Sequence, residues 1–390
     1  MNRRLATICS QSNFATDYRV EKMRRTLTSL GYSVTLLGRS HPREGRRGGG
    51  FIRYMRLLAW RGPLFYLELN VRLFLHLLLG ARQSLVVSVD LDTLPGCLAA
   101  SRLRGFRLMW DSHELFPEVP EIAHKPLVRR TWWQIQDFCV PCLRPGDICV
   151  TVCQSIADIL QGRYGRRFLV VRNVPARDRM EAVAEARREH RPQRPFTLLY
   201  QGAVNIGRGV EEAIEALVGL RECRLVVVGD GDVLGAAREL AERIGVADRV
   251  EFVGRVPFER LPAHMADADL GLVLLRDLGL NYRLALPNRV FDFIGAGLPI
   301  LACRLPEIEK IVEGEDVGMC IESLTADELS AAVQSIEARP ETLEHWMGNM
   351  LSLAPALTWE AETAELVGML TAVCDPKNVA DGATRKGKQA

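Results

Sequence analysis

One short segment, residues 197–217, combines a strand, a glycine-bearing loop and the start of a helix. In its sequence, TLLYQGAVNIGRGVEEAIEAL, a hydrophobic run ends at Gly202 and an amphipathic helix opens after Arg208–Gly209. Backbone N–H groups and the helix dipole favour anions at such a junction, and an arginine adds a guanidinium that suits phosphate. The segment predicts a phosphate site at Gly202, Arg208 and Gly209. A plain strand-to-helix turn with an exposed arginine is the alternative.

A second polar segment, LPNRVFDFIGAGLP at 286–299, begins another helix. The helix is expected to start after Pro287, where Asn288 could cap it. Arg289 in the first turn opposes the helix dipole, which is easier to accept if an anion binds there. Asp292 lies one turn after Asn288, on the same face, where its carboxylate could hold a ribose diol by two hydrogen bonds. The alternative is a surface pair between Arg289 and Asp292.

The best candidate for a catalytic group is His113, in the run MWDSHELFPEVPEI at 109–122. The run follows an expected strand at 106–110, so its polar residues stand at the carboxyl end of that strand, where open α/β sheets bind ligands. An imidazole changes charge near neutral pH, which suits proton transfer or substrate orientation. Asp111 and Glu114 could orient it. A structural histidine or a helix cap is the alternative.

A neighbouring run, VVSVDLDTL, ends another expected strand with Asp90 and Asp92. Both carboxylates could lie at the same edge of the sheet as His113, since the carboxyl ends of parallel strands meet there. Together with Glu114 they are candidates for binding a sugar acceptor. Capping of the next helix is an equal alternative for the two aspartates.

These runs stand between short β-branched segments and helical patterns, and the alternation continues along the chain. It implies parallel sheets covered by helices on both faces. Because it occurs twice, we expect an α/β protein of two doubly wound, Rossmann-like domains. Strands are expected at 4–9, 33–37, 85–89, 106–110, 147–152 and 168–172, and again at 196–201, 224–229, 249–253, 269–275, 299–303 and 318–321.

A charged, proline-ending stretch, ARDRMEAVAEARREHRPQRP at 176–195, has the composition of a linker between the two halves. A final helix is expected near Trp359, and the last residues show no periodicity. The expected organisation is an N-terminal acceptor-binding domain at 1–177, a linker at 178–195, a C-terminal nucleotide-sugar-binding domain at 196–356, a crossover helix at 357–373 and a disordered tail at 374–390.

Charge is distributed unevenly along the chain. The first 110 residues hold 18 Lys/Arg against 6 Asp/Glu, although the whole chain of 390 residues carries only +2. A basic half suggests an anionic partner, such as phosphate, nucleic acid or a membrane surface, and a solvated surface is the alternative. Nucleic acid is not expected, because the basic residues lack interleaved aromatics in any repeated pattern.

The most apolar segment, residues 64–80, carries Glu68, Arg72 and His76 and falls short of the roughly 20 residues that cross a bilayer. The start of the chain has only a brief apolar stretch, so no secretory signal is expected. We therefore expect a cytoplasmic protein. A peripheral position on the inner face of the membrane, through the basic N-terminal domain, is compatible with this pattern.

No cofactor and no metal are expected. The loop after the first strand, SQSNFATDYRV, lacks the closely spaced glycines of a dinucleotide-binding fold. Cys139 and Cys142 form a CxxC, and Cys149 and Cys153 follow in an expected strand. Four residues of strand separate the second pair by about 13 Å, too far to share one ion, so reduced and mostly buried thiols are expected.

The segments above resemble glycosyltransferase family 4, the retaining GT-B group, over nearly the whole chain. Arg208–Gly209 is similar to the family's phosphate-binding loop, and LPNRVFDFIGAGLPI resembles a variant of its signature. DSHELFPEVPEI resembles an acceptor-domain segment, and the helix with Trp359 resembles one that crosses back onto the N-terminal domain. Two positions depart from the family pattern: Leu284 and Ala203 stand where a glutamate and an arginine are usual.

The resemblance implies a GT-B fold, with two domains facing a cleft, and transfer of a sugar from a nucleotide donor to a glycan or lipid-phosphate-linked acceptor, with retention at the anomeric carbon. Such enzymes need no bound metal, since positive groups neutralise the leaving diphosphate. Here these would be Arg208, Arg289 and the helix after Pro287. Envelope polysaccharide synthesis is the expected setting. A non-catalytic scaffold subunit, suggested by Leu284 and Ala203, and a nucleotide-sugar epimerase are the alternatives.

Overall fold

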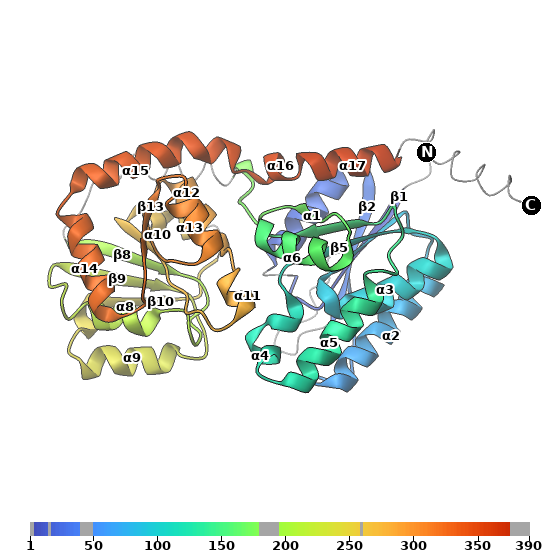
Figure 1. Ribbon diagram of the computed structural model, residues 1–390, viewed down its shortest axis with the longest axis horizontal. Coiled ribbons are helices and arrows are strands. Elements are labelled where there is room, and N and C mark those ends of the chain that lie inside the picture. The colour runs from blue at the N-terminus through green and yellow to red at the C-terminus, as the bar shows by residue number, and fades with distance from the viewer. Residues whose placement is uncertain (1–3, 15–16, 40–49, 179–194, 258–259, 375–390) are drawn as a thin grey trace, which may run out of the picture. The chain divides into compact units, whose positions relative to one another are not determined.

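The computed structural model describes residues 4–14, 17–39, 50–178, 195–257 and 260–374. The chain divides into two compact units, one formed by Met1–Arg172 with Glu362–Ala390 and the other by Asn173–Ala361. Each unit is a parallel sheet with helices packed on it (Figure 1). Residues 179–194 of the expected linker and 375–390 of the expected tail lie outside the described residues.

The first unit is built on a seven-stranded parallel sheet with the order β3-β2-β1-β4-β5-β6-β7. The sequence predicts every strand except β3, a short edge strand that is mostly half-buried and therefore gives little alternation. The strands are β1 (Arg4–Ser10), β2 (Tyr32–Arg39), β3 (Ile52–Met55), β4 (Leu85–Val89), β5 (Arg107–Ser112), β6 (Ile148–Thr151) and β7 (Leu169–Val170).

Helices connect these strands, and one from the end of the chain joins them. They are α1 (Tyr18–Ser29), α2 (Pro63–Leu79), α3 (Asp90–Arg104), α4 (Pro120–Ala123), α5 (Pro126–Cys139), α6 (Gln154–Tyr164) and α17 (Ala364–Cys374). In α2 the buried residues Phe65, Leu69, Leu73 and Leu77 recur every four positions, so one continuous face enters the core.

The side chain of Asn70 in α2 forms hydrogen bonds with α3 beside a proline. Pro95 lies inside α3, where it has no N–H to donate to the helix. The Asn70 side chain donates to the Asp92 carbonyl and accepts from the Gly96 N–H, both at 2.8 Å, so its amide bonds to both ends of the turn that contains the proline. Gly96 permits the approach of α2, since a Cβ there would lie 2.5 Å from the Asn70 oxygen.

The second unit has a six-stranded parallel sheet with the order β10-β9-β8-β11-β12-β13. The sequence predicts all six strands to within two residues. They are β8 (Phe196–Gln201), β9 (Cys223–Val228), β10 (Val250–Gly254), β11 (Leu270–Val273), β12 (Ile300–Cys303) and β13 (Gly318–Ile321). These strands carry most of the hydrophobic core of the unit, with side chains such as Leu198, Tyr200 and Leu272 fully buried.

Helices stand between these strands, as the alternating pattern predicts, but the sequence did not predict α11 or α15. The helices are α8 (Val210–Ala216), α9 (Leu234–Arg243), α10 (Leu261–Ala266), α11 (Leu280–Arg283), α12 (Asn288–Ala296), α13 (Pro306–Val312), α14 (Ala326–Glu337), α15 (Pro340–Leu353) and α16 (Trp359–Glu362).

In both sheets the order in which successive strands are added changes direction beside the first strand of the unit. The reversal falls between β1 and β4 in the first unit and between β8 and β11 in the second. Open α/β sheets bind ligands at the carboxyl edge next to such a switch point. Ser10 and Asp90 stand at that edge in the first unit, and Gln201 and Leu274 stand there in the second.

The helix expected at 357–373 is divided into α16 and α17. Trp359 is buried, and its N–H donates to the Pro175 carbonyl of the second unit at 2.8 Å. Glu362 accepts from Arg172 Nε of the first unit at 3.0 Å. The chain therefore belongs to the first unit again after residue 361.

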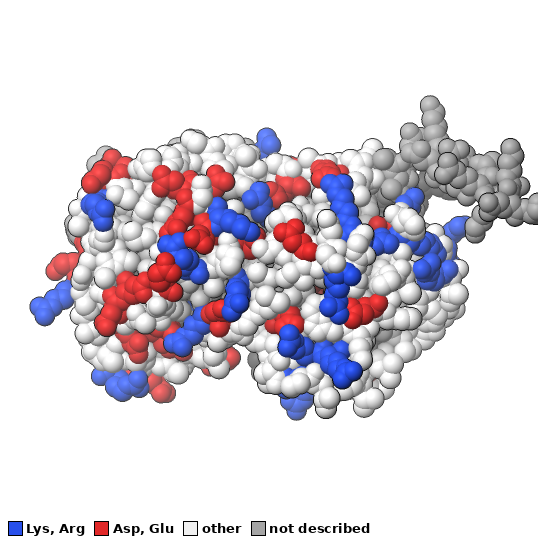
Figure 2. Space-filling model, viewed as in Figure 1, with Lys and Arg blue, Asp and Glu red and all other residues white. Residues whose placement is uncertain are grey.

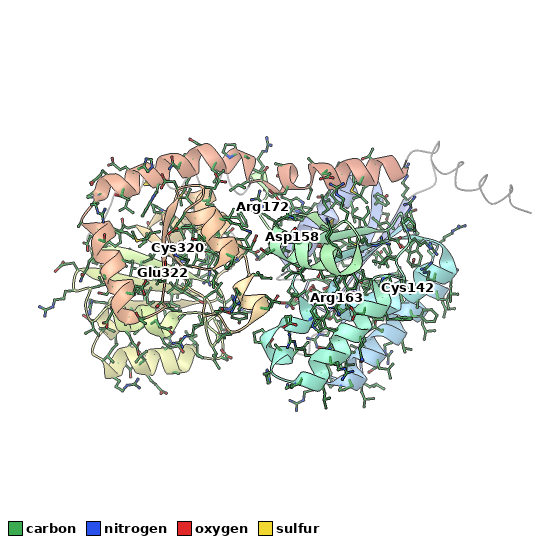
Figure 3. The ribbon with its side chains drawn as sticks, in the orientation of Figure 1. Cys142, Asp158, Arg163, Arg172, Cys320 and Glu322 are labelled. Atoms are coloured by element: carbon green, nitrogen blue, oxygen red, sulfur yellow. The ribbon has the colours of Figure 1, made fainter. Side chains whose placement is uncertain are left out.

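Among the side chains that the structure describes, nine cysteines are free thiols, and most of them are buried. Cys142 and Cys320, which Figure 3 labels, belong to different units. Burial raises the pKa of Cys139 and of Cys149 to about 12, so both thiols stay protonated at neutral pH. Within the part of the chain that the structure describes, no three His, Cys, Asp or Glu side chains are grouped to hold a metal ion.

Candidate functional site

The expected phosphate loop, between β8 and α8, packs against the loop after β9 through glycines. Gly202 has a φ of +134°, and its N–H donates to the Val228 carbonyl at 2.9 Å. A Cβ on Gly229 would lie 1.8 Å from the Gly202 oxygen, and one on Gly231 would lie 2.1 Å from the Val204 oxygen. Only glycine permits these approaches, so the two loops share one backbone surface at the carboxyl edge of the sheet.

The segment after β11 packs against the same loop. Gly209, which directly precedes α8, has a φ of +76°, and a Cβ there would lie 2.4 Å from Leu274 Cβ. The Arg276 N–H donates to the Gly207 carbonyl at 2.9 Å. The segments that follow β8, β9 and β11 therefore meet at one place, and Gly209 and Gly229 are needed for their close contact.

Arg208 keeps its guanidinium uncommitted at the edge of this loop. Its Cζ lies 5.0 Å from the centre of the Tyr282 ring, a cation–π contact that orients the charge without neutralising it. Among the described residues its buried Nε has no hydrogen-bond partner and no carboxylate pairs with it. An oriented guanidinium without a countercharge is the arrangement expected where an anion binds.

Arg289 has a different environment from the one that the sequence suggested. It is only 6% exposed, and its Nη1 donates to the Gln201 carbonyl at 2.9 Å and its Nη2 to the Leu274 carbonyl at 3.3 Å. Its guanidinium also stacks on Tyr200, at 4.8 Å from the ring centre. The alternative of a surface ion pair with Asp292 is therefore wrong, and contact of Arg289 with a phosphate stays a prediction.

Helix α12 begins at Asn288, with Pro287 as the residue before it. The expectation that Asn288 caps the helix is wrong, because its side chain makes no capping hydrogen bond and the residue is exposed. Asp292 lies one turn later, and its Oδ2 accepts from Gln201 Nε2 at 3.1 Å. Leu284, at the position where the family has a glutamate, is buried at the end of α11.

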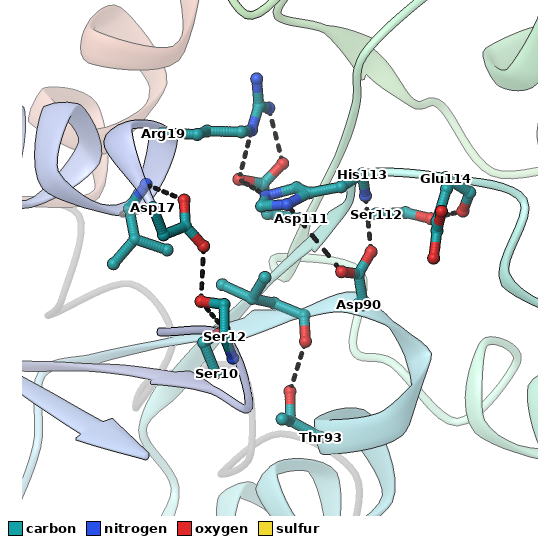
Figure 4. Close-up of polar contacts among 12 residues, drawn as sticks. Ser10, Ser12, Asp17, Arg19, Asp90, Thr93, Asp111, Ser112, His113 and Glu114 are labelled. Carbon is teal, nitrogen blue, oxygen red and sulfur yellow. Dashed lines mark hydrogen bonds and ion pairs between the residues drawn. The ribbon is translucent and has the colours of Figure 1, made fainter. Parts of the chain in front are cut away.

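A polar network in the first unit surrounds His113, just after β5 (Figure 4). Its Nε2 lies 3.1 Å from Asp111 Oδ2 and its Nδ1 3.8 Å from Asp90 Oδ2. Asp111 is buried, and Arg19 donates to it from Nε at 3.0 Å and from Nη2 at 2.7 Å. Asp111 thus orients the ring as predicted, and Asp90 supplies a second carboxylate, a role that the sequence suggested for Glu114.

The network sets the charge of the imidazole. Burial by itself would lower the pKa of His113, but the charges of Asp111 and Asp90 outweigh it and raise this pKa to about 9. Burial would raise the pKa of Asp111, but Arg19 and His113 hold it below its usual range. At neutral pH His113 is an imidazolium, and therefore a hydrogen-bond donor rather than a proton acceptor. Its Nδ1 has no hydrogen bond within the described chain.

Asp90 and Asp92 differ in exposure, although both stand in the first turn of α3. Asp90 has a φ of +57°, uncommon for a residue with a side chain, and its Oδ1 accepts from the His113 N–H at 2.7 Å. Asp92 is fully buried, and neither carboxylate oxygen has a hydrogen-bond partner among the described residues. Asp92 therefore does not reach the edge where an acceptor was expected, and neither side chain caps α3.

Sequence reasoning missed Arg19, which is buried in the first turn of α1. Its Nη1 donates to the Val171 carbonyl at 2.7 Å, in addition to its pair with Asp111. A signal was present: Asp17 caps α1 by accepting from the Val20 N–H at 3.0 Å, and an aspartate before a helical pattern marks a helix start. This start marks the helix that carries Arg19 but not the partner of its side chain, which lies 92 residues further along the chain.

The predicted site residues form two groups, one in each unit. Each group stands at the carboxyl edge of its own sheet, beside or near the switch point, except that the Asp92 side chain is buried and does not reach that edge. The second unit holds Gly202, Arg208, Gly209, Pro287, Asn288, Arg289 and Asp292, and the first unit holds Asp90, Asp92, Asp111, His113 and Glu114.

The family whose sequence model matches this chain does so within the second unit. The sequence model of the family described as "Glycosyl transferases group 1" matches residues 195–338. The chain is 29% identical over 160 residues to the GDP-mannose-dependent alpha-(1-6)-phosphatidylinositol monomannoside mannosyltransferase of Mycobacterium tuberculosis, covering 40% of this chain and 42% of that protein. It is 30% identical over 156 residues to the protein of that name from Mycolicibacterium smegmatis, covering 36% and 41%. The matched region spans about two fifths of these relatives.

Solved structures resemble the whole chain in fold. Sucrose-phosphate synthase from Thermosynechococcus elongatus superposes with a TM-score of 0.72 at 18% identity, covering 95% of this chain and 99% of that one. Anabaena HepE in complex with UDP gives 0.69 at 13% identity, covering 95% and 100%. WaaG, a glycosyltransferase involved in lipopolysaccharide biosynthesis, gives 0.66 at 18% identity, covering 92% and 99%. Residues 195–338 thus resemble the group 1 glycosyltransferases in sequence, and the two parallel-sheet units have the GT-B fold.

Proposed function

We propose that this chain transfers a sugar from a nucleoside diphosphate donor to a glycan or lipid-linked acceptor, with retention of configuration at the anomeric carbon. The observation that carries the proposal is the loop at the switch point of the second unit, where the uncommitted Arg208 borders a backbone surface built by glycines. This loop lies inside the region that matches the family. A GDP-mannose-dependent relative and a fold neighbour bound to UDP support a nucleotide donor.

In the proposed reaction, the bond between the anomeric carbon and the diphosphate oxygen breaks while the acceptor oxygen bonds to the same face of that carbon. The acceptor's hydroxyl proton passes to the leaving phosphate oxygen. Negative charge grows on the diphosphate, so a fixed guanidinium at Arg208 stabilises the transition state more than the ground state. Cationic side chains supply the countercharge in this scheme, so it includes no metal ion.

His113 would act in this reaction as a cationic hydrogen-bond donor. Its pKa of about 9 leaves few neutral rings at pH 7, so it is a poor proton acceptor there. Its Nδ1–H is the donor without a hydrogen bond among the described residues, and a substrate hydroxyl or phosphate oxygen would accept it. We therefore assign it orientation and charge stabilisation, with Asp111 and Arg19 as positioning residues.

The acceptor and the setting are proposed from the relatives. The mycobacterial proteins are named for mannosyl transfer to a phosphatidylinositol monomannoside, and WaaG for lipopolysaccharide biosynthesis. Both names support an envelope glycolipid or polysaccharide as the acceptor class here. Leu284 is buried and removes one polar contact that the family pattern would place near the donor sugar. Nucleotide binding without transfer to any acceptor would therefore favour a scaffold subunit.

Nucleotide binding by wild-type protein and two arginine variants tests the donor site. Thermal unfolding with UDP, GDP, ADP and their common sugars should show stabilisation by one nucleotide, about 2.7 kcal/mol at a hundredfold excess over its dissociation constant. Arg208→Ala should weaken that binding by about tenfold or more, since a charge-assisted bond is lost. Arg221→Ala is the matched control, an exposed arginine before β9 in the same unit, and should bind as the wild type does.

Equal affinity in Arg208→Ala and the wild type would refute the assigned donor site, and binding of no nucleotide at all would refute the donor class. The stereochemistry has its own assay. The anomeric proton coupling of the first-formed product, followed by NMR, should show the configuration of the donor. A product of opposite configuration would refute retention while leaving the donor site intact.

A further inference from the structure

Helix α2 of the first unit is apolar on two opposite faces. Its buried face enters the core, as described above. On the other side, Leu64, Leu67, Val71, Leu75 and Leu79 are exposed, at spacings of three and four residues, so they form one stripe along the whole helix. Surface helices normally carry polar residues there, and an exposed apolar stripe marks an interaction surface.

The stripe is extended by the segment before the helix. Leu58 is 84% exposed and Trp60 55%. The Glu68 carboxylate holds this segment on α2: it accepts from the Leu58 N–H at 2.8 Å and from the Ala59 N–H at 2.9 Å. The same carboxylate pairs with Arg72 at 2.7 Å. The only carboxylate of α2 is thus fully engaged, and its bonds present Leu58 and Trp60 to solvent beside the stripe.

Uncompensated positive charge surrounds this surface. Arg53, Arg56, Arg61 and Arg82 are exposed, and none of them has an ion-pair partner among the described residues. Arg56 and Arg61 precede α2, and Arg82 follows it. The pKa of His76 in α2 is lowered, mainly by burial of the ring and also by the charge of Arg53. Arg53 therefore lies close to this helix. In Figure 2 the surface over α2 is mostly free of charged residues, and a group of Lys and Arg lies beside it, over α4 and α5.

We propose that this α2 surface, formed by the stripe with Leu58, Trp60 and the four arginines, docks on an anionic lipid bilayer. The helix would lie in the plane of the interface, with its leucines among the acyl chains and its arginines at the headgroups. No helix of the described chain has the length and hydropathy to cross a membrane, so the contact is peripheral. The proposal rests on this surface alone and not on the proposed sugar transfer.

A second copy of the chain fits the surface less well than a bilayer does. In a two-fold symmetric dimer the same patch meets itself, so the arginines of one copy would face those of the other. The patch supplies no carboxylates to offset this repulsion, because Glu68 is already bound. Acidic headgroups supply the missing negative charge, and acyl chains accept the exposed leucines and Trp60.

Co-sedimentation of the full chain with lipid vesicles tests the proposal. The wild type should pellet with vesicles of equal parts phosphatidylglycerol and phosphatidylcholine, should pellet less in high salt, and should stay in solution with phosphatidylcholine alone. Leu67→Gln with Val71→Gln should weaken binding by about tenfold or more. Arg56→Gln with Arg61→Gln should weaken it by about fivefold for each charge. Val218→Gln with Leu351→Gln, equally exposed apolar residues of the second unit, is the matched control and should bind as the wild type does.

The proposal would be overturned by no pelleting with anionic vesicles at low salt, by binding unchanged in the leucine–valine variant, or by equal loss in the second-unit control. If light scattering shows a lipid-free dimer that the Leu67→Gln and Val71→Gln variant turns into a monomer, the surface is a protein interface and the proposal is wrong. The arginine variant keeps the test valid if the apolar variant does not fold. Nucleotide binding, measured on each variant, should be unchanged, which separates this test from that of the donor site.

Discussion

The charge of His113 should make the stability of the chain depend on pH in a defined direction. The ring has an ordinary pKa of 6.5 when the chain is unfolded and a pKa of about 9 between Asp111 and Asp90. At about 1.4 kcal/mol for each pH unit, this difference corresponds to about 3 kcal/mol. Because the folded pKa is the higher one, this stabilisation is fully present below pH 6.5 and is lost as the pH rises through about 9.

The assay is denaturant unfolding of the wild type and His113→Gln across this range. The difference in free energy of unfolding between them should shrink by about 3 kcal/mol from about pH 6 to about pH 10. NMR titration of the His113 ring, assigned by its absence in His113→Gln, should give the pKa directly. Asp111→Asn should lower that pKa more than Asp90→Asn does, since Asp111 lies closer to the ring.

Two results would refute this reasoning about His113. Parallel pH curves for the wild type and His113→Gln would show that the ring has the same pKa in the folded and unfolded chain. A ring titration near pH 6.5 would show that the two carboxylates do not hold the proton. Either result would also remove the basis for treating His113 as a cation in the proposed reaction and would return it to the list of candidate general bases.

Three further changes have expected effects on stability or binding. Asn70→Leu should lower the free energy of unfolding by about 2 kcal/mol, since the bonds to Gly96 N–H and the Asp92 carbonyl are both lost; denaturant unfolding measures it. Gly209→Ala should destabilise by about 2 kcal/mol or more and abolish nucleotide binding, because its Cβ would meet Leu274 and its φ is positive. Asp92→Asn should stabilise the chain at neutral pH, with a gain that disappears in acid, because burial raises the pKa of this carboxyl well above its usual range. Unfolding curves at acidic and neutral pH that show no such gain would contradict this explanation of Asp92.

The strands were predictable because hydrophobic runs in a doubly wound fold are buried on both faces. β4 and β8 illustrate this: every residue in each is buried, so each shows as a continuous apolar segment. β3, a half-buried edge strand, gives no such segment. α15 carried a usable signal, with Pro340 at its first position and Trp346 and Met350 on its buried face, but its mostly exposed surface dilutes the pattern.

For the site, the sequence located the edge of each sheet but not the environment of each side chain. Gly202, Gly209 and Arg208 stand where the pattern of strand, loop and helix predicts them. The burial of Asp92 could not be predicted, because an aspartate after a strand looks the same whether it faces solvent or the core. The partner of Asp111 could not be predicted either, since Arg19 is 92 residues away in sequence and only the fold brings them together.

Arg19 and Arg289 share a position that explains why an arginine near a helix start is ambiguous in sequence. Each is the second residue of its helix and is nearly buried. Each donates from Nη1 to a carbonyl oxygen in or just after a neighbouring strand, Val171 for one and Gln201 for the other. A cation there opposes the helix dipole, and its desolvation is offset by these carbonyls and, for Arg19, by Asp111.

Arg19 and Arg289 stabilise the carboxyl edge of each sheet through hydrogen bonds inside the protein. Their N–H donors are therefore largely occupied before a ligand binds. A diphosphate at the second unit must then find its countercharge in a guanidinium without a protein partner, and Arg208 has that property among the described residues. Desolvation explains why Arg289 and Arg208 differ. A buried guanidinium is stable only when its N–H groups are hydrogen-bonded, whereas a half-exposed one stays hydrated by water until an anion binds. Arg289→Lys should therefore lower the stability of the unit, and Arg208→Lys should chiefly lower nucleotide affinity.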